Sequence, residues 1–134
     1  MIALEEKIPF GSATICNILR RLPDMSDERI ERTKSAVDAA DHLPAEKKAA
    51  LSEALSKLKP ALAQISQTHR EDAESIARLV EASAHEATRR KKHPTLLKTL
   101  LHALKQSVQD FEVSHPNLVA FVGEYSTLLS GMGI

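Results

Sequence analysis

The sequence has few residues that could cross-link a fold. Cys16 is its only cysteine, which excludes a disulfide within the chain and a metal site built from several thiolates. The residues around it, from Ile15 to Leu19, are mostly aliphatic. We therefore interpret Cys16 as a small packing residue and not as a reactive thiol.

Aromatic residues are also scarce. They form 3% of the chain and tryptophan is absent, so the interior has to be aliphatic. Leucine and alanine, which are strong helix formers, dominate the composition. A chain of 134 residues of which 43% are hydrophobic is long enough to bury one core. We predict one all-α domain over residues 1–134, a bundle of about five helices.

Neither sign of charge is in excess. The chain has 18 Lys and Arg and 18 Asp and Glu, so its total charge favours no nucleic acid, anionic membrane or acidic substrate. No apolar run reaches the ~18 residues of a membrane-spanning helix. The early acidic residues Glu5 and Glu6 do not fit a secretory signal. We expect a cytoplasmic protein that does not enter a membrane.

Residues 1–42 predict two short helices. Ser12 can cap a helix that Pro23 ends. The apolar residues of this helix share one side: Ile15, Ile18, Leu19 and Leu22. The same run is also compatible with a short strand. Ser26 is a suitable N-cap for a second helix, which has only a narrow apolar edge.

Residues 43–92 predict the longest helical segment. Its apolar residues alternate at four and three positions, a leucine seam that suits packing against another helix. The seam contains Leu51, Leu55, Leu58, Leu62, Ile65, Ile76 and Val80. Pro60 interrupts it. Either two helices meet near Lys59, or one long Pro-kinked helix of roughly 70 Å runs from about residue 44 to residue 92 and needs a partner chain.

Residues 93–134 are the most apolar part of the chain. His93-Pro94 and His115-Pro116 each open a run with helical apolar spacing, and proline suits the first helical position. We predict a C-terminal antiparallel helical hairpin that earlier helices or another subunit cover.

The end of the chain resembles a known family. The residues concerned are Phe111-Glu112-x-x-His115-Pro116-x-Leu118, then an apolar helix, then Gly133-Ile134. This pattern resembles the C-terminal signature of a family of short bacterial helical proteins classed as a domain of unknown function. The close resemblance covers residues 111–134 and a looser one reaches back to residue 43. It implies an all-helical fold and no activity.

The same signature is explained by structural roles. Phe111 and Leu118 can anchor the core on either side of a turn, while Glu112 or His115 serves exposed amides and Pro116 fixes φ. Gly133 and Ile134 can tuck the apolar end of the chain into the bundle. Glu112 beside His115 is the one place in the signature where a site could form.

No catalytic or metal motif is complete. His85-Glu86-x-x-Arg89 has arginine where a zinc-protease helix needs its second histidine. Glu81 and His85 share a helix face, as do His69 and Asp72, but two ligands make a weak metal site. The two pairs lie too far from each other along a helix to share one ion. We predict no catalytic, cofactor or metal site and no enzyme activity.

A basic run, Arg89-Arg90-Lys91-Lys92, closes the middle segment. Basic residues in a last turn offset the negative end of the helix dipole, which is the interpretation we favour. The alternatives are contact with phosphate or nucleic acid, although no aromatic lies among these residues for stacking, and docking on an acidic partner or an anionic lipid surface.

We therefore predict a non-enzymatic helical protein that acts as an adaptor or scaffold. It would self-associate as a dimer, or bind a protein partner, through the leucine seam. Two alternatives stay open: a bundle that binds a small ligand or metal through interior polar groups such as Glu112, His115 and Tyr125, and nucleic-acid contact through the basic run.

Overall fold

The computed structural model describes residues 25–133 as an all-α bundle, and no strand occurs in this range. Its elements are α2 (Met25–Ala39), α3 (Ala45–Ser66), α4 (Arg70–Ala87), α5 (Pro94–Val108), the 3-10 turn η1 (Gln109–Phe111) and α6 (Pro116–Gly133). The predicted all-α bundle of about five helices is confirmed. The helix or strand expected over residues 12–22 lies outside the described residues, as does Ile134.

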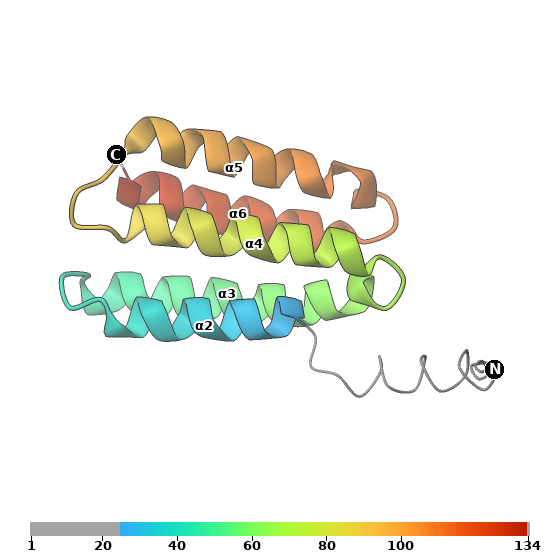
Figure 1. Ribbon diagram of the computed structural model, residues 1–134, viewed down its shortest axis with the longest axis horizontal. Helices are drawn as coiled ribbons and strands as arrows, with labels where there is room; N and C mark the ends of the chain where they lie inside the picture. The colour runs from blue at the N-terminus through green and yellow to red at the C-terminus, as the bar shows by residue number, and fades with distance from the viewer. Residues whose placement is uncertain (1–24, 134) are drawn as a thin grey trace, which may run out of the picture.

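The helices run back and forth in two layers (Figure 1). α2, α4 and α5 form the nearer layer in this view, and α3 and α6 lie behind it. α4 contacts every other helix of the described chain: α2, α3, α5 and α6. α3 lies between α2 and α6, and α5 packs beside α6. One side of the α3–α6 pair therefore faces α4, while the opposite side faces away from the nearer layer.

The middle of the chain is not one long helix, and its two helices do not meet near Lys59. α3 continues through Pro60 to Ser66, and α4 begins at Arg70 after a turn at residues 67–69. Pro60 is tolerated because it is exposed, so water can bond the carbonyl group that loses its helical partner. The chain turns at 67–69 because the seam has no apolar residue there; both Thr68 and His69 donate their amides to the carbonyl of Ile65.

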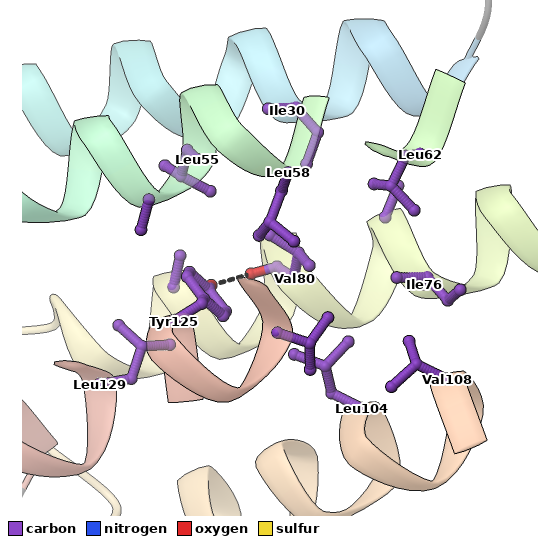
Figure 2. Packing of buried hydrophobic residues seen from close by; sticks show 14 of the residues in the cluster. Ile30, Leu55, Leu58, Leu62, Ile76, Val80, Leu104, Val108, Tyr125 and Leu129 are labelled. Carbon is purple, nitrogen blue, oxygen red and sulfur yellow. Dashed lines mark hydrogen bonds between the residues drawn. The ribbon is translucent and has the colours of Figure 1, made fainter. Parts of the chain in front are cut away.

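The leucine seam lies in the core of this single chain. All seven of its side chains, on α3 and α4, are fully buried at 0% exposure. They pack with Ile30 of α2, Leu104 of α5 and Leu129 of α6 (Figure 2). The other helices of the same chain therefore bury the apolar surface that we expected a second chain to cover.

One buried hydrogen-bond cluster joins α6 to α4. The Tyr125 hydroxyl is completely buried and donates to the carbonyl oxygen of Val80 at 2.6 Å (Figure 2). The Ser83 hydroxyl lies 3.0 Å from the Tyr125 hydroxyl and 3.0 Å from the same carbonyl. Burial raises the pKa of Tyr125 above its ordinary value of 10.0. A polar cluster whose members are all bonded fixes how the two helices sit against each other.

Tyr125 predicts a loss of stability at alkaline pH. Because burial raises the pKa of its phenol, the folded chain keeps the proton at a pH where the unfolded chain releases it. The stability contributed by the protonated phenol is fully present below about pH 10 and is lost as the pH rises further. We expect the free energy of unfolding, measured by urea denaturation, to fall more steeply between about pH 9 and pH 11 in the native chain than in Tyr125→Phe.

The Tyr125→Phe chain is the required comparison, because lysine residues also titrate in this range. Tyr125 is the only tyrosine and the chain has no tryptophan, so phenolate absorbance reports on this residue alone. An ordinary phenol titration near pH 10 in the folded chain would contradict the burial effect.

Candidate interaction surface

The turn between α5 and α6 is built around Phe111. This residue is buried, and its ring packs edge-on against His69 at 5.3 Å and against His115 at 5.9 Å between ring centroids. The amide of His115 donates to the carbonyl of Phe111 at 2.7 Å, and Leu118 is buried one turn later. These edge-on contacts of Phe111 with the two histidine rings connect the α3–α4 turn to the α5–α6 turn at one end of the bundle.

The polar residues considered for an interior site do not come together. The Glu112 side chain is exposed, and His115 pairs through Nδ1 with the Ser114 hydroxyl at 3.1 Å. Tyr125 is buried elsewhere, on Val80 and Ser83. A pocket formed by Glu112, His115 and Tyr125 is therefore not present.

The two ligand pairs weighed and set aside in the sequence do not extend to a metal site in residues 25–133. Glu81 is held by Arg29 at 2.7 Å and by Arg32 at 3.6 Å, so its carboxylate serves an ion pair between α2 and α4. Within this range there is no group of three or more histidine, cysteine or acidic side chains that could hold a metal. The same range contains no helix with the length and apolar character needed to cross a membrane.

We expected the basic run to lie in the last turn of a helix, and this prediction is wrong. α4 ends at Ala87, so all four residues belong to the loop before α5. Arg89 pairs with Glu86 at 2.9 Å, and the Lys92 ammonium donates to the carbonyl of Met132 near the end of α6. Lys92 thus offsets the negative end of α6 instead of α4. Arg90 and Lys91 are exposed.

A groove between α3 and α6 was not predicted. It is open to solvent, has a volume of about 490 Å³ and is lined by four residues of each helix: Ala50, Glu53, Ala54 and Lys57, and Gly123, Glu124, Thr127 and Leu128. Small side chains separate the two helices there, and charged groups stand along the edge. Leu128 is one of the partly buried apolar residues at the margin of the core.

The charge in this groove is predominantly negative. The Lys57 ammonium lies 3.2 Å from the Glu124 carboxylate and 3.9 Å from the Glu53 carboxylate. It also lies 6.0 Å from the centre of the Phe121 ring. Two carboxylates therefore share one cation among the lining residues.

Gly123 lines this groove and also a smaller one of about 280 Å³ between α5 and α6. A Cβ atom at Gly123 would meet nothing within 4 Å. Glycine inside a helix costs roughly 0.5–1 kcal/mol relative to alanine, and no close contact within the chain offsets that cost here. Gly131 has equally open space but is not among the residues that line either groove.

The sequence contained one weak signal for this surface. Gly123 interrupts an apolar helical run well before its end, where glycine is unfavourable. Nothing local in the sequence relates it to Ala50 or Ala54, which look like ordinary helix formers. The helix also continues through Gly131 to Gly133.

Comparison with known proteins identifies the chain at the level of a family. A family model described as Domain of unknown function (DUF4404) matches residues 51–134. The match begins within α3 and takes in α4, α5 and α6, whereas α2 precedes it. No curated protein and no solved structure matches the chain significantly. Because the family match covers more than half of the chain, the protein belongs to this family of unknown function.

Proposed function

We propose that the protein is a non-enzymatic helical module that binds an amphipathic helix of a partner protein in the α3–α6 groove. The observation that carries this proposal is Gly123, a glycine inside a helix that lines the groove and has no contact within the chain to explain it. The proposal accounts for the open space at Gly123 as room for a side chain of the partner.

The shape of the groove supports a helix as the occupant. Helices pack by inserting the side-chain ridges of one into the grooves of the other. Ala50, Ala54 and Gly123 are too small to fill the space between α3 and α6, so large aliphatic side chains of a third helix can enter. The volume of about 490 Å³ falls within the roughly 300–1,000 Å³ typical of binding pockets.

The charge at the edge supports a basic partner. Glu53 and Glu124 share Lys57 and remain 75% and 53% exposed. A partner helix with arginine or lysine beside its apolar stripe would complete this arrangement. Because the charges are exposed, they would direct orientation and association rate more than affinity.

Other modes of action have less support. Self-association through the leucine seam would require burying side chains that already lie in the core. Nucleic-acid affinity depends on the number of phosphates contacted, and Arg89 and Lys92 of the basic run are engaged within the chain. A bundle that binds a ligand through Glu112, His115 and Tyr125 would need these groups to converge, and they do not.

The binding test uses a labelled synthetic helical peptide with leucine at i, i+3, i+4 and i+7 and flanking arginines. The protein is the full chain of 134 residues. We expect fluorescence anisotropy to give a Kd of about 1–100 μM, and Gly123→Leu in the same chain to weaken binding about tenfold or more by filling the groove.

The matched control is Gly131→Leu, which adds the same side chain to the same helix outside the groove. It should bind the peptide like the parent chain. Absence of binding to the parent chain, or equal binding by the Gly123→Leu chain, would show that the groove is not a helix-binding site. Sedimentation in the same buffer shows whether a second copy of the chain competes for the groove.

Substitution of Gly123 should affect the free energy of unfolding and peptide binding in different ways. Gly123→Ala should raise the free energy of unfolding by about 0.5–1 kcal/mol, because the added methyl group meets open space and lowers the entropy of the unfolded chain. Gly131→Ala should act in the same direction. Urea denaturation measures both. A destabilised Gly123→Ala chain would mean that glycine is needed for packing within the bundle, which would remove the argument from Gly123.

A further inference from the structure

We infer that the partner helix crosses α6 at Gly123 and fills both grooves that border this helix, the α3–α6 groove and the smaller α5–α6 groove. This inference rests on the proposed function and extends it, because it defines how the partner lies, how its apolar residues are spaced and where its charge belongs. The observation behind it is that Gly123 lines both grooves.

The two grooves lie on opposite flanks of α6. This helix contacts both α3 and α5, and those two helices do not contact each other in the described part of the chain. α6 is therefore the ridge between the grooves. At Gly123 the ridge has no side chain, and a Cβ atom there would meet nothing within 4 Å. A crossing helix can approach the backbone of α6 closely at this point.

The grooves are displaced along α6, which sets the direction of the partner. The α3–α6 groove uses residues 123–128 of α6, and the α5–α6 groove uses residues 119–123. Their centres are therefore about one helical turn, roughly 5 Å, apart along α6 and about one helix diameter, roughly 10 Å, apart across it. A helix that joins them crosses α6 at about 60°, near the roughly 50° of the commonest helix-packing class.

The spacing of apolar residues in the partner follows from this geometry. The same dimensions place the two groove centres about 11 Å apart. Seven residue steps of an α-helix extend about 10.5 Å, so apolar residues at i and i+7 reach the two grooves while those at i+3 and i+4 lie over Gly123. A partner that lay along the α3–α6 groove would instead place all of these residues between α3 and α6.

The lining of the second groove suits an apolar side chain. Three of its residues are valines: Val108 and Val122 are buried, and Val119 packs against the margin of the core. Lys105 and Glu112, which also line this groove, are exposed. An aliphatic residue of the partner would therefore contact valine side chains below and leave the charged groups in water.

The charges of the two grooves orient the partner. The α3–α6 groove has two carboxylates and one ammonium group, whereas the α5–α6 groove has one of each, on Glu112 and Lys105. A helix with basic residues at the end over α3 and no net charge at the end over α5 complements both grooves. Because these charges are exposed, they select the orientation more than they add affinity.

The test fills each groove separately in the full chain. Gln109→Trp fills the α5–α6 groove, and Gln106→Trp is its matched control, because both glutamines are exposed and only Gln109 lines the groove. Ala50→Trp fills the α3–α6 groove, and Ala49→Trp, at an exposed position outside the lining, is its control. Fluorescence anisotropy with the labelled leucine peptide measures affinity, and urea denaturation shows whether each variant is folded.

We expect Gln109→Trp and Ala50→Trp each to weaken peptide binding about tenfold or more, and both controls to bind like the parent chain. Replacing the leucine at i or at i+7 of the peptide by alanine locates its two ends. The loss of affinity from one replacement should disappear in the Gln109→Trp chain, and the loss from the other should disappear in the Ala50→Trp chain.

Unchanged binding by either groove variant would overturn the crossing. Weakening by Ala50→Trp alone would leave the proposed function standing, with the partner along the α3–α6 groove, whereas no binding to the parent chain would remove both. If the parent chain sediments as a dimer that Gly123→Leu converts to a monomer, the grooves belong to a second copy and the partner helix is overturned.

Discussion

Burial of α4 against all four of the other described helices holds this molecule together. Ile76 and Val80 are completely buried on α4, and the Val80 carbonyl also receives the Tyr125 hydroxyl from α6. Because α4 contacts both α3 and α6, it fixes the spacing between these two helices. The groove on their other side is therefore a consequence of the core, and its width does not depend on a loop.

The groove also follows from the number of layers. α2, α4 and α5 cover one side of α3 and α6 (Figure 1), and no described helix covers the opposite side. Most of that outer surface needs no cover, because Glu53, Glu124 and Thr127 are exposed polar residues. Gly123 is the exception, since a helix that served only to close the core would gain stability from alanine at this position.

The stretch from Phe111 to Leu118 has a structural explanation in this chain. Phe111 joins two turns through its contacts with His69 and His115, and Leu118 returns the chain to the core. Glu112 remains exposed without joining these contacts. Residues that looked like candidate chemistry in the sequence thus hold the end of the bundle, while the surface with unexplained features lies in the middle of α3 and α6.

The sequence by itself determined the helical class and the seam residues of the core, because helical periodicity and burial are both read from the spacing of apolar side chains. It did not determine where α3 ends. Pro60 is the stronger local signal for a break, yet the helix passes through it because that position faces water, and the chain turns at the polar residues 67–69. Only the tertiary structure decided that the leucine seam is satisfied within one chain and that Ala50 and Ala54 face Gly123. These contacts depend on how α4 spaces two helices that are distant in sequence, and no local pattern carries that distance.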